Sequence, residues 1–520
     1  MKNAAKGALT ALILSFGLFG SAPVKAATPA DTLVVGVASD PSILDPAVTS
    51  DNFDWRQSYY AYDRLVKYSV VDGQGSTEVE PMLAESWSVS DDGLVWTFKI
   101  RQGVAFSDGT ILNAEVVKFS FDRALAINMG PAGNLESLDK VDVIDPYTVQ
   151  FTLKYPFAPF LQILAANGCS IVNPAVMQHE VNGDMARAWL SQNMDGSGPY
   201  IMTEWQRGER LVLEARKDYW GGEAAIKRII IRPMRETSDR RLALEMGDID
   251  ITESIMADQL PNLEKHPEVT VGRYDGQFVE YVYLNNTDAV LSNKLVRQAL
   301  SYAVDYAGII DYVLQGDAEQ MRGPIPRGMW GHNPEAFQYS RNPQKARELL
   351  QEAGYGKGLN LTLIYSERRA VWEQIATILQ ANFAEIGVTL KLEMMANPTL
   401  RDRFAKADYQ LCLGAWSPDF ADPFMFANFW YDTQFQGLPG NRAFYSNPQV
   451  DEMLRKAASS TDHAERVKLY TEVQDIVIDD AAYILLYQLK AVIPFRNNVK
   501  GFVFNPMLES MYNFDGITKN

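Results

Sequence analysis

The chain has 520 residues, a formal net charge of −17 and a sequence pI near 4.8. So acidic a chain is a poor partner for nucleic acid or anionic membrane surfaces, and is expected to stay soluble. Its length corresponds to about three domain-sized units of roughly 150 residues each. A chain of this length can bury a large hydrophobic core without disulfide bonds or structural metal ions.

The first 26 residues are predicted to be a secretory signal peptide. MKNAAK supplies positive charge, ALTALILSFGLFG is a short apolar core, and SAPVKA ends with the small-x-small pattern of a cleavage site. We expect cleavage after Ala26, which removes three lysines and no acid. No cysteine lies near that site, which argues against a lipoprotein anchor. No later run reaches the roughly 18 apolar residues of a membrane span, so we predict an exported, soluble protein.

The first half of the mature chain is predicted to contain antiparallel strands. LVWTFKIRQGVAF at 94–106 and YTVQFTLKY at 147–155 alternate between apolar and polar residues, as antiparallel strands do. TLVVGVA at 32–38 is a further expected strand. Cys169 and Cys412 are the two cysteines of the sequence. Export would permit a bridge between them, but the sequence leaves open whether they pair.

The second half is predicted to be α/β. NPQKARELLQEAGYG at 342–356 is a helix with Asn342 as N-cap and Gly354 past its end. It is followed by a strand at 359–365, a helix at 372–387 and a strand at 388–395. This order predicts a parallel, right-handed βαβ unit. A further strand, YQLCLGAW at 409–416, precedes two helical pieces within 455–482.

Two of these strands end in charged residues. SERRA follows the strand at 359–365 and contains Arg368 and Arg369; SPDFADP follows the strand at 409–416. Because ligands collect outside the carboxyl ends of strands in open parallel sheets, we expect these groups to lie along the same edge. With Ser366 as N-cap, the arginines fall in a first helical turn, where the helix dipole disfavours cations. They are either solvated or hold a ligand anion.

The two aspartates of this stretch support different interpretations. Asp422 stands directly before Pro423 and fits a turn-forming role. Asp419 lies between Pro418 and Phe420, where it fits either a turn or a carboxylate held in an apolar pocket for a cationic ligand group. The aromatic residues around it, Trp416 and Phe420 among them, are interpreted mostly as core, with stacking on sugar rings as the alternative.

Residues 81–125, PMLAESWSVSDDGLVWTFKIRQGVAFSDGTILNAEVVKFSFDRAL, are followed in order by GSGPYIMTEWQRGERLVLEARKDYWGG, LVRQALSYAVD and NPQVDEML. In order and spacing these segments resemble the peptide-binding family of extracytoplasmic solute-binding proteins of ABC transporters, which includes dipeptide-, oligopeptide- and nickel-binding members. The resemblance covers essentially all of the mature chain. Ser107 and Val116 depart from the family's usual histidine and aspartate, and bear on packing more than on ligand choice.

The resemblance implies a two-lobed α/β periplasmic-binding-protein fold that closes by a hinge. The first lobe would comprise 27–275 and 496–520, with an additional subdomain at about 70–220, and the second lobe 276–495. In WSPDFADP the residue matching the family's ligand α-amino group contact is Asp419, flanked by Trp416 and Phe420. Arg368 or Arg369 would hold the ligand carboxylate, and the first lobe would contribute Ser39, Ser42 and Leu44.

The implied function is that of a periplasmic, monomeric binding protein that captures short peptides and delivers them to ABC permease subunits in the inner membrane. The alternative is an oligosaccharide or sugar-conjugate binder of the same transporter family. An enzyme is not expected, because the four histidines are scattered and no GxSxG, HExxH or P-loop motif occurs. We expect no cofactor and no metal.

Overall fold

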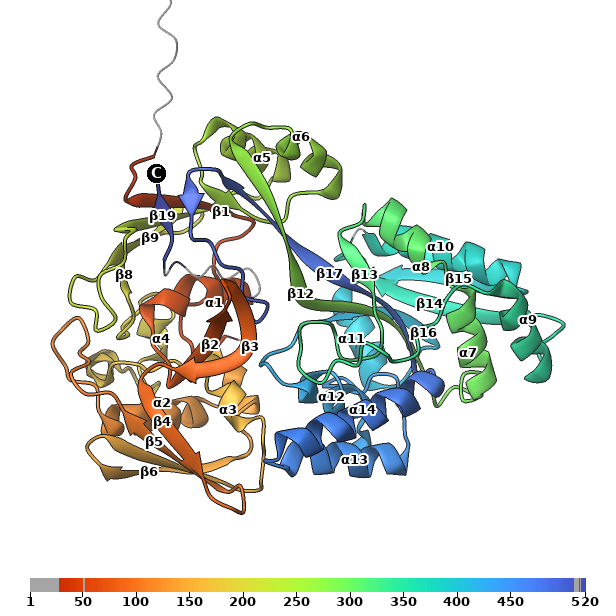
Figure 1. Cartoon of the computed structure of the whole chain (residues 1–520), viewed down its shortest axis with the longest axis horizontal. Helices are drawn as coiled ribbons and strands as arrows, with labels where there is room; N and C mark the ends of the chain where they lie inside the picture. The colour runs from red at the N-terminus through yellow and green to blue at the C-terminus, as the bar shows by residue number, and fades with distance from the viewer. Residues whose placement is uncertain (1–27, 50–51, 370, 509–513, 515) are drawn as a thin grey trace, which may run out of the picture.

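The computed structural model describes residues 28–49, 52–369, 371–508, 514 and 516–520, so the predicted signal peptide and its cleavage site lie outside the described residues. The chain forms two α/β lobes joined by two long, crossing strands, β12 (Val269–Leu284) and β17 (Tyr483–Arg496) (Figure 1). Within the described part of the chain, no helix combines the length and apolarity required to cross a membrane.

A single sheet of eleven described strands runs through both lobes. Its order is β15–β14–β16–β12–β17–β11–β1–β10–β9–β8, with β13 added on β17. The crossing strands β12 and β17 therefore carry the sheet from one lobe into the other. The remaining strands are β1 (Thr32–Val37), β8 (Tyr200–Gln206), β9 (Arg210–Ala215), β10 (Arg228–Pro233), β11 (Ile251–Thr252), β13 (Ala318–Gln320), β14 (Leu359–Ser366), β15 (Val388–Met395) and β16 (Leu411–Trp416).

The predicted βαβ unit of the second lobe is confirmed. β14 and β15 pair in parallel along their whole length, and β16 lies parallel on the other side of β14. The crossover helix α10 (Val371–Glu385) buries Ile375, Leu379 and Phe383 completely, because these residues recur at helical spacing on one face. The carboxyl ends of β14 and β16 thus lie at the same edge of the sheet.

The helices predicted around this unit are also present. In α9 (Pro343–Glu352), the Asn342 side chain accepts a hydrogen bond from the Lys345 N–H at 3.0 Å, as an N-cap does. Gly354 follows with φ +90°, the left-handed conformation that ends helices. The two helical pieces near the C-terminus are α13 (Pro448–Ser459) and α14 (His463–Asp479).

The first lobe carries an additional four-stranded antiparallel sheet, in the order β4–β5–β7–β6. Its strands are β4 (Ala84–Val89), β5 (Val95–Ile100), β6 (Leu138–Asp145) and β7 (Thr148–Leu153), and helix α2 (Ala114–Ile127) packs on it. Phe151 makes edge-on contacts with Phe98 at 5.4 Å and Phe121 at 4.8 Å, which join sheet and helix. The antiparallel strands predicted within 94–106 and 147–155 are confirmed as β5 and β7, which pair with one another.

The other helices and a hairpin complete the lobes. The hairpin is β2 (Val66–Val71) and β3 (Gln74–Pro81); the helices are α1 (Asn52–Ser58), α3 (Phe160–Ile163), α4 (Arg187–Leu190), α5 (Thr237–Met246), α6 (Leu260–Glu264), α7 (Lys294–Ala303), α8 (Tyr306–Gly308), α11 (Asn397–Ala405) and α12 (Asn428–Tyr431). Cys169 and Cys412 are both free and buried, so the structure contains no bridge between them.

The two crossing strands contain a break in register. Residues 269–275 of β12 pair with 490–496 of β17, and pairing resumes at Val279 opposite Gln488. Such an irregularity interrupts the ladder and lets a strand bend. This break lies in the connection between the two lobes.

Candidate functional site

A cavity of about 790 Å³ lies where the two lobes meet. One wall comes from residues 133–163 of the first lobe and the other from residues 419–459 of the second. The wall is rich in aromatic rings and carries a few charged groups. The lining residues include Asn134, Glu136, Tyr155, Phe157, Asp419, Phe420, Phe424, Phe429, Pro439 and Arg455.

Asp419 is an acidic residue that lines this cavity. β16 ends at Trp416, and the Ser417–Pro418 turn brings Asp419 onto the wall. Asp419 is exposed to the cavity, while the protein around its carboxyl group removes bulk water and raises the pKa of Asp419 to about 6, against the effect of a hydrogen bond from Asn134. No ion pair of Asp419 is found among the described residues, so the carboxylate lacks a cationic partner.

Asp422 has a different role. It is fully buried, accepts a hydrogen bond from the Phe424 N–H at 2.9 Å and forms an ion pair with Arg466 at 2.8 Å. Its side chain caps the short turn at Pro423–Met425. The turn-forming interpretation of Asp422 is therefore confirmed, and its charge is already neutralised within the protein.

Aromatic side chains surround Asp419. Phe420 lines the cavity and stacks on Phe424 with ring centroids 6.2 Å apart. Trp416 is half-buried and stacks at 5.1 Å on Phe429, which also lines the cavity. The indole N–H of Trp416 has no hydrogen-bond partner among the described residues. These aromatic rings therefore belong to the hydrophobic core, and two of them, Phe420 and Phe429, also form part of the cavity wall.

The structure separates the two arginines of SERRA. Arg369 forms an ion pair with the buried carboxylate of Glu280 on β12 and lies 4.3 Å from the ring centre of Phe278. Glu280 also accepts hydrogen bonds from the Trp372 indole N–H at 2.7 Å and the Tyr487 hydroxyl at 2.6 Å. Arg369 is therefore committed to a buried network on the crossing strand.

Arg368 is exposed, and no ion pair of this side chain is found in the described part of the chain. Its backbone N–H donates to the Ser366 hydroxyl at 3.2 Å. Ser366 is the last residue of β14 and α10 begins at Val371, so the prediction that Ser366 caps the helix is wrong. The turn between strand and helix is longer than the sequence pattern suggests. Neither arginine is among the described residues that line the cavity.

The predicted first-lobe contributors also lie outside the described wall of this cavity. Ser42 donates its N–H to Asp54 at 2.6 Å, and buried Leu44 donates its N–H to the Ser191 carbonyl at 3.2 Å. Ser39 is half-buried after β1. The first-lobe wall comes instead from the segments holding Asn134, Glu136, Tyr155 and Phe157, which sequence reasoning missed. Tyr155 and Phe157, the aromatic pair that follows β7, are the feature of the sequence that could have indicated this wall.

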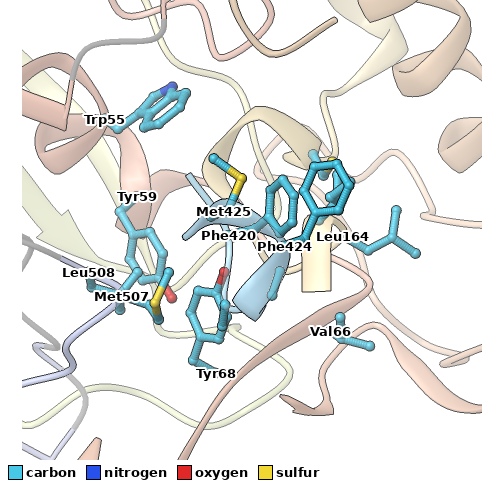
Figure 2. Packing of buried hydrophobic residues seen from close by; sticks show 14 of the residues in the cluster. Trp55, Tyr59, Val66, Tyr68, Leu164, Phe420, Phe424, Met425, Met507 and Leu508 are labelled. Atoms are coloured by element: carbon cyan, nitrogen blue, oxygen red, sulfur yellow. The ribbon is translucent and has the colours of Figure 1, made fainter. Parts of the chain in front are cut away.

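The lobes touch one another around the cavity. The Tyr68 hydroxyl of the first lobe donates to the Gln162 carbonyl of the same lobe at 3.5 Å and also faces the backbone of Ala421 on the second lobe, and Phe157 meets Phe424 edge-on at 5.1 Å. Figure 2 shows Phe420, Phe424 and Met425 packed among first-lobe side chains that include Tyr59 and Tyr68. The structure thus has the lobes closed on one another. Among the described residues, no group of three or more His, Cys, Asp or Glu side chains could hold a metal ion.

Comparison with known proteins identifies the family to which the chain belongs. Residues 78–437, well over half of the chain, match the family of bacterial extracellular solute-binding proteins, family 5. The chain belongs to this family. The family 5 protein described here is 46% identical over 494 residues to the probable D,D-dipeptide-binding periplasmic protein DdpA of Escherichia coli K12, with 95% of each chain covered.

Two solved structures show the same fold. HbpA2 from Haemophilus parasuis superposes with a TM-score of 0.86 at 31% identity, covering 94% of this chain and 100% of that one. The Helicobacter pylori ABC transporter-associated periplasmic binding protein DppA, in complex with the peptide STSA, superposes with a TM-score of 0.78 at 29% identity, covering 94% and 98%. Family membership confirms the two-lobed fold and makes this chain a solute-binding protein, not an enzyme.

Proposed function

We propose that this family 5 protein captures short peptides between its lobes and delivers them to the permease of an ABC importer. One observation carries the proposal: the carboxylate of Asp419 lines an apolar cavity without a cationic partner among the described residues. A charge in such a place is costly unless something pairs with it. The α-ammonium group of a peptide supplies the missing charge, with a charge-assisted hydrogen bond.

The relatives support a peptide ligand. DdpA is named as a probable D,D-dipeptide-binding protein, and DppA of Helicobacter pylori was solved with the peptide STSA. A cavity of about 790 Å³ is within the roughly 300–1,000 Å³ of small-molecule sites, with room for a short peptide. The aromatic walls would accept its apolar side chains.

We assign the carboxylate end of the peptide to Arg368, which lies outside the described wall of the cavity, so that a peptide held at Asp419 would have to extend beyond this wall to reach it. Arg369 is held by Glu280, whereas Arg368 is exposed and has no ion pair among the described residues. Both Arg368 and Asp419 follow the carboxyl ends of neighbouring parallel strands, β14 and β16. We place the change of lobe at the register break of β12, which gives a first lobe of 27–275 and 496–520 and a second lobe of 276–495.

In this proposal the protein is cleaved after Ala26 and works in the periplasm. It acts there as a monomer and binds no nucleic acid. The periplasmic name of DdpA supports the location, and the net charge of −17 opposes contact with a polyanion. The partner in the membrane would be the permease, which receives the closed, loaded form.

Titration calorimetry tests the proposal with three ligands: Ala-Ala, its N-acetylated form, and a disaccharide such as maltose. We expect micromolar binding of Ala-Ala, about −8 kcal/mol, and none of the acetylated peptide, because acetylation removes the ammonium charge. Binding of the disaccharide without Ala-Ala would favour the sugar alternative. Equal binding of both peptides would overturn the role of Asp419.

A further inference from the structure

Glu136 lines the same cavity as Asp419, from the opposite lobe. It lies in the segment that leads into β6, and Asn134, two residues earlier, donates the side-chain hydrogen bond to Asp419. Glu136 is exposed, and no ion pair of its carboxylate is found in the described part of the chain. The nearby Lys154 ammonium donates instead to the Glu136 backbone carbonyl, at 2.9 Å. The cavity therefore holds two carboxylates without a cationic partner, one from each lobe.

Arg455 is the basic residue among the described residues of the cavity wall. Its guanidinium lies 2.7 Å from a carboxylate oxygen of Asp432, which is fully buried, and 3.7 Å from one of Asp451. Because these ion pairs lie within the second lobe, the charge of Arg455 is already balanced there. The wall thus presents an excess of negative charge to whatever enters the cavity.

Ser137 adds a hydrogen-bonding group that the protein leaves unused. It lines the cavity and is 2% exposed, yet its hydroxyl has no hydrogen-bond partner among the residues that the structure describes. A buried hydroxyl without a partner costs free energy. The Ser137 carbonyl accepts a hydrogen bond from the Lys154 N–H at 2.8 Å, which fixes this segment beside the end of β7. A ligand N–H donor could satisfy the free hydroxyl.

Tyr155 and Phe157 form an aromatic wall next to Glu136. Both line the cavity, and their rings meet edge-on with centroids 6.2 Å apart. Tyr155 is 46% exposed, and both desolvation and the negative charge of Glu136 raise its pKa, so the carboxylate lies close to this ring. Aromatic faces accept the alkyl stem of a long side chain and attract a cation at its end.

We propose that Glu136 and Ser137, with the rings of Tyr155 and Phe157, form a subsite for a basic side chain of the ligand. The corresponding ligands are short peptides whose N-terminal residue is lysine or arginine. The inference rests on the proposed function, in which Asp419 holds the α-ammonium group. Such a peptide carries two cationic groups near one end, and these match the two carboxylates that face each other across the lobes.

Calorimetry with Lys-Ala and norleucyl-alanine tests this, because norleucine has the carbon chain of lysine without the ammonium group. We expect Lys-Ala to bind about fivefold more tightly, the effect of one partly exposed ion pair. In E136Q the ratio should fall toward one. In the control D139N, which removes an exposed carboxylate of β6 outside the described cavity wall, the ratio should persist. E136Q should melt as wild type does, because no ion pair is lost.

Three outcomes would overturn the inference: equal affinities of Lys-Ala and norleucyl-alanine, an unchanged ratio in E136Q, or the same advantage for Ala-Lys over alanyl-norleucine. The last result would indicate attraction by the overall negative charge and not a subsite beside Asp419. If norleucyl-alanine nevertheless binds in an Asp419-dependent manner, peptide capture stands and the basic preference alone is wrong. If no peptide binds, the proposed function fails, and this inference fails with it.

Discussion

The carboxylate of Asp419, on the second lobe, is hydrogen-bonded to the side chain of Asn134, on the first. The neutral amide of Asn134 can donate a hydrogen bond to this carboxylate but does not neutralise its negative charge. Asp419 is therefore positioned across the interface between the lobes without being neutralised there. In the proposed function, a ligand ammonium group would supply the charge that Asn134 lacks, and closure of the lobes would then stabilise the bound state.

Ligand affinity should depend on pH through Asp419. Its pKa is raised to about 6 by burial, so below pH 6 the carboxylate is protonated and the ammonium ligand loses its partner. We expect the affinity for Ala-Ala to fall by roughly tenfold per unit well below pH 6. Calorimetry from pH 4.5 to 8 measures this. The dependence should vanish in D419N, and a flat profile in wild type would contradict the assignment.

The same group should make the ligand-free protein less stable as pH rises. The folded pKa of Asp419 lies above the unfolded value of 3.8, so the folded state binds the extra proton between pH 3.8 and about 6, and stability falls as pH rises through that window. D419N removes the charge and should unfold no more readily than wild type at pH 7, as measured by urea denaturation. A clear loss of stability would instead indicate a structural role.

Asp422 should behave in the opposite way. D422N leaves the buried Arg466 without its anion, and breaking a buried ion pair costs about 3–5 kcal/mol. Urea denaturation should show this loss in D422N and not in D419N. The matched pair of substitutions, three residues apart, separates the structural carboxylate from the ligand-binding one.

The two neighbouring arginines should also separate by experiment. R369Q leaves the buried Glu280 uncompensated and should cost about 3 kcal/mol of folding free energy. R368Q should leave stability unchanged and weaken binding of Ala-Ala. Thermal melts and calorimetry on both variants check this. Normal peptide affinity in R368Q would show that the ligand carboxylate is held elsewhere.

The Tyr68 hydroxyl should help hold the lobes together. Y68F removes the hydroxyl that faces the Ala421 backbone across the lobes and donates at 3.5 Å to the Gln162 carbonyl within the first lobe. Such a contact is worth about 1 kcal/mol, and no residue of the described cavity wall is changed. We expect a larger population of open molecules in the ligand-free protein. Small-angle X-ray scattering should report a larger radius of gyration for Y68F, and ligand should restore the wild-type value.

The sequence alone determined the local architecture of the second lobe. Apolar residues at helical and strand spacing predicted α9, α10, β14 and β15, and the parallel order placed the ends of β14 and β16 at one edge. The order of the motifs indicated the family. Asp419 was identified because a carboxylate among aromatic residues is unusual at the level of sequence.

Only the tertiary structure decided which charges are already paired. Glu280 lies 89 residues from Arg369, and Arg466 lies 44 residues from Asp422. No local pattern encodes such partners, because the two members of each pair meet through packing of separate elements. The contact between Asn134 and Asp419 likewise joins segments that are far apart in the sequence. The ligand-binding role of a charged residue depends on the absence of a partner, and this is a property of the folded surroundings, not of neighbouring residues in sequence.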